Sequence, residues 1–315
     1  MYKIKYPHGI MFHHFHDNIN HFKGQGSISA SQFIKILRHI GLKNISNPKD
    51  FLKDIINKNK KVCLTFDDSL KCQFDIALPI LKKYKIKAYF FIYTSIFEKD
   101  YEYMEVYRFF RDNYFKNIDE FYKIFFHIYE NEKKILLNKY FKKKDKIIKK
   151  IKKNAPFYSL NDIKYRYLRD KKLNKKELHE IMLKIFRIKK ININKIKKRL
   201  FLSKSDIKLL VSQGHAIGLH SHTHPYLLKN LSKFNQNQEY KKNKSILSKI
   251  SNTKIFSMSH PCGSYNKDSI QILKKLNIDI GFKSSLIFDH KKKQINLSNL
   301  EIAREDHTNI LKMIK

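Results

Sequence analysis

The chain has 315 residues, 42% of them hydrophobic, so it can bury a substantial core and is not a disordered tail. Its 66 Lys and Arg against 28 Asp and Glu give a formal net charge of +38, which ordinarily indicates nucleic acid or an anionic membrane as partner. Lys far outnumbers Arg, the residue that phosphate-reading proteins favour, so we expect no nucleic acid and interpret the charge mainly as compositional bias and solvated surface, with an acidic partner as the alternative.

The first hundred residues alternate between strand and helix patterns. A Ser at position 29 precedes an amphipathic run and predicts a capped helix start. The segment 74–84 predicts a helix in which Pro79 is tolerated at a turn or kink. Apolar runs predict three buried strands, at 9–12, 62–66 and 86–93. This order favours parallel β-α-β units.

The composition then changes to a Lys-, Tyr- and Phe-rich segment with apolar residues at helical spacing. We interpret residues 98–202 as a helical insertion between two parts of one α/β domain, 1–97 and 203–315. Its most basic part, 141–153, is interpreted as a solvated helix face. The alternative is that it touches an anionic membrane surface or a phosphorylated or lipid-linked substrate.

The α/β pattern returns after the insertion. A helix beginning near Ser205 is expected to end at Gly214, a residue suited to the left-handed position after a helix. Short apolar runs predict three further strands, at 216–219, 255–258 and 278–282.

Cysteine usage and the N-terminus indicate the compartment. The three cysteines are odd in number and form no Cys-x-x-Cys pair, which fits a reducing environment. The N-terminal segment has no long apolar stretch followed by a small-residue cleavage site, and no apolar run reaches about 18 residues. We therefore expect a cytoplasmic protein.

Two adjacent carboxylates, Asp67 and Asp68, follow the strand predicted at 62–66. Neighbouring anions at the end of a buried strand need a cation or a proton to tolerate one another. In isolation, the pair could equally be a helix N-cap or an exposed loop end.

The strand predicted at 216–219 leads into a histidine cluster in which His220 and His224 are four residues apart. Such a pair can bind one metal ion, and a carboxylate from another strand would complete the ligand set. In a chain with 15 His, the cluster alone could be structural or incidental. Because parallel α/β folds gather functional residues at the carboxyl ends of strands, both motifs together favour metal-assisted hydrolysis of an amide or ester.

Three motifs resemble those of the polysaccharide deacetylase family, also called the NodB-homology or carbohydrate esterase 4 group. They are TFDD at 65–68, GHAIGLHSHTHPYL at 214–227 and SHPCGSYN at 259–266. The resemblance covers roughly residues 8–97 and 203–306 and leaves the insertion outside. It implies an α/β fold of the NodB-homology type, a distorted, incomplete (β/α) barrel.

The resemblance also implies a divalent metal ion, most often Zn²⁺, held by three side chains: Asp68, His220 and His224. Asp67 would be the general base, and Ser221 and Thr223 would support the histidine loop by hydrogen bonds. His222 occupies a position that varies in the family and is not expected to be a ligand.

The third motif departs from the family's Arg-x-Pro-Tyr form, because Ser259 and Cys262 replace the Arg and the aromatic residue. Cys262 keeps the backbone N–H that helps to hold the oxyanion in the family. The missing Arg normally orients the catalytic Asp, so either another cation does so or activity is reduced. Arg304, expected after the last strand, is the candidate, and the alternative is a surface ion pair with Glu301 or Glu305.

The general acid is open between two histidines. The family often uses a late Leu-x-His motif, which this chain lacks. His307 comes near the corresponding place, and His13 ends the first predicted strand, with His14 and His16 as weaker candidates. For His13, a structural role is an equal alternative.

The favoured interpretation is a metal-dependent hydrolase that removes an N-acyl group, N-acetyl in the first instance, from an amino sugar. A nucleotide- or lipid-linked precursor of surface polysaccharide is the expected substrate. Two alternatives stay open: an amidohydrolase acting on a non-sugar amide, and a non-catalytic carbohydrate or anionic-surface binder. The oligomeric state is not predicted.

Overall fold

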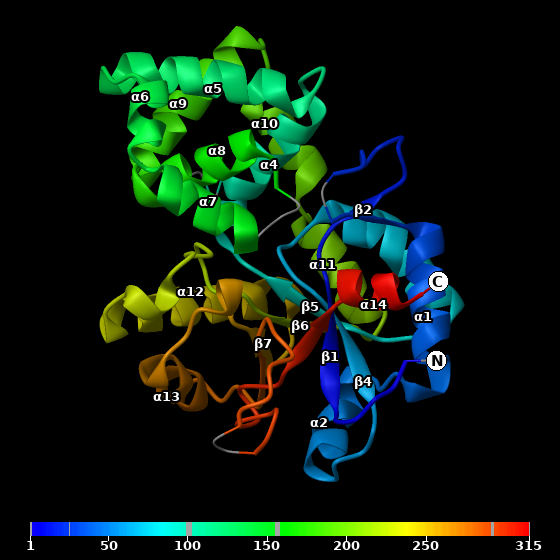
Figure 1. The fold of residues 1–315 in the computed structure, drawn as a ribbon. Helices are drawn as coiled ribbons and strands as arrows, with labels where there is room; N and C mark the ends of the chain where they lie inside the picture. The colour runs from blue at the N-terminus through cyan, green and yellow to red at the C-terminus, as the bar shows by residue number, and fades with distance from the viewer. Residues whose placement is uncertain (1, 25, 99–102, 155–157, 291–292, 315) are drawn as a thin grey trace. The chain divides into compact units, whose positions relative to one another are not determined.

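The computed structural model describes residues 2–24, 26–98, 103–154, 158–290 and 293–314 (Figure 1). The chain forms two compact units, unit 1 with Met1–Glu102 and Leu200–Lys315 and unit 2 with Tyr103–Arg199. The insertion was expected over 98–202, and residues 99–102, near its start, lie outside the described ranges.

Unit 1 is built on a seven-stranded sheet in which all neighbouring strands are parallel. The strands stand in the order β8 (Ile280–Phe282), β7 (Ser257–Ser259), β6 (Ala216–Leu219), β5 (Tyr89–Ile92), β4 (Val62–Phe66), β1 (His8–Phe12) and β9 (Arg304–Asp306). The segment entering β9 also meets β8 through a bridge between Ile302 and Phe282. The sheet therefore nearly closes and leaves a seam, which confirms the distorted, incomplete (β/α) barrel.

The helices of unit 1 lie along its outside, where all but the last connect its strands (Figure 1). They are α1 (Ala30–Ile40), α2 (Pro48–Ile56), α3 (Leu78–Lys83), α11 (Lys204–Ser212), α12 (Lys233–Ser251), α13 (Lys267–Lys275) and α14 (His307–Met313). Smaller elements are strands β2 (Phe15–His16) and β3 (Ile28–Ser29) and the short helices η1 (Leu42–Asn44), η3 (Ser95–Phe97), η4 (Leu228–Asn230) and η5 (Pro261–Gly263). Ser29 caps α1 as predicted, with a capping box to Gln32.

The helix predicted at 74–84 is divided in two. Its first part, η2 (Gln73–Ala77), is a π-helix in which the N–H of Leu78 donates to the carbonyl of Gln73. The wider turn accommodates Pro79 near the start of α3, because proline has no N–H and its ring crowds the preceding turn.

Aromatic side chains fill both faces of the sheet. On one face, Phe12 of β1 and Phe66 of β4 stack and meet Phe33 of α1 edge-on. On the other, Tyr89 and Phe91 of β5 pack in one buried cluster with residues from α2, β4, β8 and the segment before β9: Phe51, Cys63, Ile280, Phe282 and Ile302. Burial on both faces explains why these strands read as continuous apolar runs.

The described part of unit 2 is helical. It contains α4 (Met104–Asn113), α5 (Ile118–Lys133), α6 (Leu137–Lys142), α7 (Asp145–Asn154), α8 (Leu160–Lys171), α9 (Lys175–Ile188) and α10 (Ile193–Leu200). Its core is aromatic, with Phe110 of α4 stacked on Phe186 of α9 at 3.9 Å between ring centroids. Among the helices described in either unit, none combines the length and apolar character needed to cross a membrane.

Candidate active site

The carboxyl ends of β4 and β6 bring the two predicted motifs together. After β4 the backbone takes left-handed conformations at Asp68 (φ 73°) and Ser69 (φ 60°), and after β6 it does so at Ser221 (φ 60°) and His224 (φ 51°). Non-glycine residues adopt this conformation only at a cost in free energy, which is often incurred at functional sites. These turns direct side chains from both strand ends toward one point.

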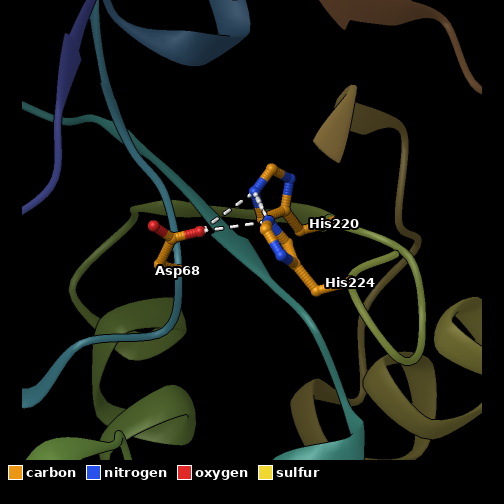
Figure 2. Close-up of side chains that lie close together, drawn as sticks. All are labelled: Asp68, His220 and His224. Atoms are coloured by element: carbon orange, nitrogen blue, oxygen red, sulfur yellow. Dashed lines mark hydrogen bonds and ion pairs between the residues drawn. The ribbon is translucent and has the colours of Figure 1, made fainter. Parts of the chain in front are cut away.

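Three side chains meet there with the geometry of a metal site. Oδ1 of Asp68 lies 3.3 Å from Nε2 of His220 and 3.3 Å from Nε2 of His224, and the two ring nitrogens are 3.2 Å apart. Figure 2 shows both imidazoles facing the same carboxylate oxygen. Tetrahedral zinc with bonds of 2.0–2.2 Å separates its ligand atoms by about 3.3–3.5 Å, so this donor set fits the ion.

The two imidazoles are held by neighbouring groups. Nδ1 of His220 lies 2.9 Å from the carbonyl oxygen of Ser259. A proton on Nδ1 would donate to this oxygen, and Nε2 would then carry a lone pair directed toward the other two donor atoms. The N–H of His220 donates to Asn243, and the N–H of His224 donates to Ser221 Oγ. Such contacts orient ligands before any metal binds.

A carboxylate that the sequence did not reveal supports the same loop. Glu239 of α12 accepts hydrogen bonds from the N–H groups of His222 and Thr223 and from the Thr223 hydroxyl. Neither Glu239 nor Asn243 belongs to a recognisable motif. Both lie on α12, a helix whose weak amphipathic pattern gave no signal.

The closest partners of Asp67 differ from those of Asp68. Arg304 donates to both of its carboxylate oxygens at 2.8 Å, and Ser259 Oγ donates to Oδ2 at 3.2 Å. Burial alone would raise the pKa of Asp67, but the charge of Arg304, and then that of His220, holds the pKa below its ordinary value. Asp67 is therefore an anion held in one orientation.

The position expected for Arg304 was wrong in one respect. It stands in β9 rather than after the last strand, and it is 1% exposed, so the surface ion pair with Glu301 or Glu305 does not form. Its Nε donates to the carbonyl of Lys283. The guanidinium thus reaches Asp67 from β9, although the family's usual Arg precedes the Pro of the third motif.

A glycine makes room for this side chain. Gly9 of β1 is paired with Arg304 in the sheet, and a Cβ at Gly9 would lie 2.9 Å from Cγ of Arg304. That approach is too close for a real Cβ, so only glycine leaves space for the arginine to cross toward Asp67.

The two candidate proton donors have different surroundings. Nε2 of His13 lies 3.9 Å from Oδ2 of Asp67 and 3.7 Å from Oδ2 of Asp68, and its side chain is 27% exposed. Both ring nitrogens of His307 instead face main-chain carbonyls, those of Met11 at 3.1 Å and Gly26 at 3.0 Å. His307 is buried away from the carboxylates that His13 meets.

The other histidines of these motifs have separate contacts. His222 places Nδ1 2.9 Å from Thr94 Oγ1 and Nε2 3.2 Å from Glu98, so its described contacts differ from those of the three clustered donors. His16 meets Ser27, and the His14 ring is stacked against that of His13.

Cys262 follows β7 on the same edge of the barrel. It lies in η5 with φ 51° and is exposed, so its main chain is at the barrel mouth rather than in the core. A left-handed residue between Pro261 and Gly263 turns the chain sharply after Ser259.

Solved structures support the fold. A Streptococcus pyogenes deacetylase, PplD, solved with acetate, is 17% identical, with a TM-score of 0.54 over 99% of this chain and 100% of that one. IcaB from Ammonifex degensii is 14% identical, with a TM-score of 0.53 over 95% and 90%. A de-N-acetylase from Aggregatibacter actinomycetemcomitans is 12% identical, with a TM-score of 0.56 over 98% and 99%.

The comparison with family models gives the assignment. No curated protein matches this chain. The model described as polysaccharide deacetylase matches residues 54–117 and 171–281, which is more than half of the chain. The match includes both the adjacent aspartates and the histidine pair. The chain therefore belongs to the polysaccharide deacetylase family and is a hydrolase that acts on amide bonds.

Proposed function

We propose that this protein uses a divalent metal ion, in the first instance zinc, to remove an N-acetyl group from an amino sugar. The observation that carries the proposal is the set of three donor atoms on Asp68, His220 and His224, whose separations of 3.2–3.3 Å match tetrahedral zinc. A zinc ion bound there would supply Lewis-acid polarisation of the acyl carbonyl and a lower pKa for water.

The chain's own groups divide the proton transfers. Asp67, kept ionised by Arg304, takes a proton from the attacking water. His13 gives a proton to the leaving amine, since its ring is partly exposed beside both aspartates, whereas both ring nitrogens of His307 face carbonyls. The backbone N–H of Cys262 helps to hold the oxyanion. Water adds to the acyl carbon, the C–N bond breaks, and acetate and the free amine result.

Acetate release from acetylated amino sugars tests this assignment. The zinc-loaded parent is expected to release acetate, and Asp67→Asn is expected to lose about 10²–10⁴ of the rate, because the amide cannot accept the proton. His13→Gln should lower the rate more than His307→Gln. A parent rate preserved in Asp67→Asn would overturn the mechanism.

For the substrate, we propose a nucleotide- or lipid-linked amino sugar made in the cytoplasm, with unit 2 docking to an anionic membrane surface. Residues 103–199 contain 30 Lys and Arg but only 11 Asp and Glu. On α7, the exposed Ile147 has the exposed Lys150, three residues on, as a neighbour on the helix surface, and Lys146 and Lys149 are further exposed lysines of this helix. A basic helix face with an apolar side chain suits the headgroup region of anionic lipids.

Assays with sugars and vesicles test these two statements separately. Acetate release from N-acetylglucosamine, its uridine diphosphate form and its lipid diphosphate form ranks the substrates. Vesicles with phosphatidylglycerol should retain the protein at low salt, and Lys→Glu at 146, 149 and 150 should weaken retention, unlike Lys→Glu at exposed Lys58 and Lys60. Equal retention on neutral vesicles would contradict the membrane proposal.

A further inference from the structure

One buried amide joins the ends of two strands at the candidate active site. Gln73, the first residue of η2, is fully buried. Its Nε2 donates to the main-chain carbonyl of His13 at 2.9 Å and to that of Asp67 at 2.6 Å. His13 follows the last residue of β1 and Asp67 follows the last residue of β4. A single side chain therefore bridges the main chains of the proposed acid and the proposed base.

The bridge begins where the strand pairing ends. The register between β1 and β4 closes with Phe12 opposite Phe66, and the N–H of Asp67 donates to the carbonyl of Phe12 at 3.1 Å. Within the described residues, the pairing of these strands stops there. Beyond this point, strand pairing no longer fixes the distance between the main chains of His13 and Asp67. The side-chain amide of Gln73 connects them instead.

The oxygen of the same amide makes no hydrogen bond with the described residues. Gln73 Oε1 is buried, and no donor in the described part of the chain reaches it. Turning the amide over would point this oxygen at two carbonyl oxygens, so the orientation is fixed by its surroundings. A buried acceptor without a partner costs free energy, and an apolar side chain would avoid that cost. The residue is therefore best explained by its two N–H groups.

The π-helix gives this side chain its position. The turn that starts at Gln73 is wide, closed by the bond from Leu78 N–H to Gln73 carbonyl, and π turns recur at functional sites. The neighbouring Cys72 also reaches back toward the first strand, since its Sγ accepts from the N–H of Phe15 at 3.3 Å. Cys72 and Gln73, at the start of η2, thus both contact the segment that follows β1.

We propose that Gln73 is a positioning residue that sets the spacing of Asp67 and His13. The inference rests on the proposed function, in which these two side chains move protons on opposite sides of the scissile amide. Their side chains are now 3.9 Å apart, between Oδ2 of Asp67 and Nε2 of His13. Misplacement of a catalytic group by about 1 Å can reduce a rate about 100-fold. The two hydrogen bonds from Gln73 to these main chains should therefore affect kcat.

Gln73→Met tests the proposal, with Gln236→Met as its matched control. Methionine keeps the length of the side chain and removes both N–H groups. Gln236 of α12 is also fully buried, and its Nε2 donates to the carbonyl of Leu231 at 3.0 Å. Each zinc-loaded variant is measured for zinc stoichiometry, melting temperature, and kcat and KM on the acetylated sugar that the parent hydrolyses.

We expect Gln73→Met to lower kcat by about 10- to 100-fold, with KM and zinc stoichiometry as in the parent. Gln236→Met should keep kcat within about twofold while melting at a lower temperature. The proposal is overturned if Gln73→Met keeps the parent kcat. It is also overturned if that variant loses zinc and kcat together with a larger fall in melting temperature than the control, because that pattern describes a structural role.

A crystal structure of zinc-loaded Gln73→Met separates this inference from the function on which it rests. The distance between the Cα atoms of His13 and Asp67 should increase relative to the parent. An unchanged distance would overturn the role of Gln73. A parent that releases no acetate, together with an increased distance in the variant, would reject the proposed function and leave the positioning role standing.

Discussion

Arg304 donates to both oxygens of Asp67 from a position that is almost fully buried. A buried ion pair is expensive to break, because removing one partner leaves an uncompensated charge in the core. The same pairing keeps the proposed base ionised and fixes the direction of its lone pairs. Orientation and charge of Asp67 therefore depend on one side chain from β9.

Replacing this arginine should affect both folding and catalysis. We predict that Arg304→Met lowers the free energy of unfolding by about 3–5 kcal/mol. Because the largest charge that opposes burial is then lost, the pKa of Asp67 should rise, and the acidic limb of the activity profile should move to higher pH. Arg304→Lys should recover part of the activity, since it restores charge without the two-pronged geometry.

The control is Arg38→Met, which removes an exposed arginine from α1. Urea unfolding and the pH dependence of acetate release measure the two effects. An Arg304→Met variant with parental stability and an unmoved acidic limb would show that the ion pair does not hold Asp67.

His215 provides a second prediction at the level of single residues. Its Nδ1 accepts a hydrogen bond from the N–H of Ala88, and burial, followed by the charge of Lys87, lowers its pKa from 6.5 to about 4. The unfolded chain gains a proton here below pH 6.5, whereas the folded protein gains it only near pH 4. The contribution to stability is therefore complete above pH 6.5 and is lost as the pH falls toward 4.

When the pH falls from 7 to 5, this histidine should lower the free energy of unfolding of the parent by about 2 kcal/mol. Over the same pH range, the free energy of unfolding of His215→Gln should fall by about 2 kcal/mol less than that of the parent. The control, His290→Gln, changes an exposed histidine and should keep the pH dependence of the parent. Urea unfolding with a chelator present measures the difference. Identical pH dependence in the parent and in His215→Gln would contradict the assignment.

At the level of elements, β9 closes most of the gap in the barrel. It pairs with β1, while Ile302 just before it bridges to β8. Arg304 is the first residue of this strand. The strand at the seam of the sheet therefore also carries the guanidinium that pairs with Asp67. Gly9 on the neighbouring strand leaves the space that the Arg304 side chain occupies, so a larger residue there would displace the arginine.

Gly9→Ala should therefore disturb the site through the sheet. The new Cβ would lie 2.9 Å from Cγ of Arg304 and 3.2 Å from Cδ1 of Phe282. We predict a loss of about 1–3 kcal/mol in unfolding free energy from overpacking, and a lower rate of acetate release because Arg304 is displaced.

Gly41→Ala is the control for general destabilisation. Gly41 follows α1 with φ 86°, so alanine there is strained by about 1–2 kcal/mol without reaching the site. Equal activity in the two variants at matched stability would show that Gly9 has no special relation to Arg304.

The strands with strong apolar runs were predictable, and the ones without them were not. The strand at 62–66 was predicted with its observed bounds, as was the one at 216–219, because burial on both faces leaves only apolar or small residues. By contrast, β9 has the sequence Arg-Glu-Asp and shows no apolar pattern. Its strand geometry comes from pairing with β1, which no local signal reports.

Across the whole molecule, the site depends on chain segments that only the folded barrel brings together. Asp68 and His220 are far apart in sequence, and the metal donors could be named because each lies in a recognisable motif at a strand end. Glu239 and Asn243, which support the histidine loop, lie in no motif, and neither does Gln73, which contacts the main chains of His13 and Asp67. Their roles follow from packing between elements, so sequence patterns could not identify them.

Zinc binding should consequently stabilise unit 1 as a whole. An ion that binds only the folded state adds about 4 kcal/mol at a thousandfold excess over its Kd. Because the donors come from two strand ends, the ion links those ends in the native state. The melting temperature of the metal-free protein should therefore rise when zinc is added.

Titration of metal-free protein with zinc, followed by calorimetry and by the melting temperature, tests the central claim most directly. We predict one tightly bound zinc ion per chain and a higher melting temperature in the parent and in His290→Ala. Both effects should disappear in Asp68→Ala and in His220→Ala. Zinc bound with the same stoichiometry and the same stabilisation in these two variants would contradict the account.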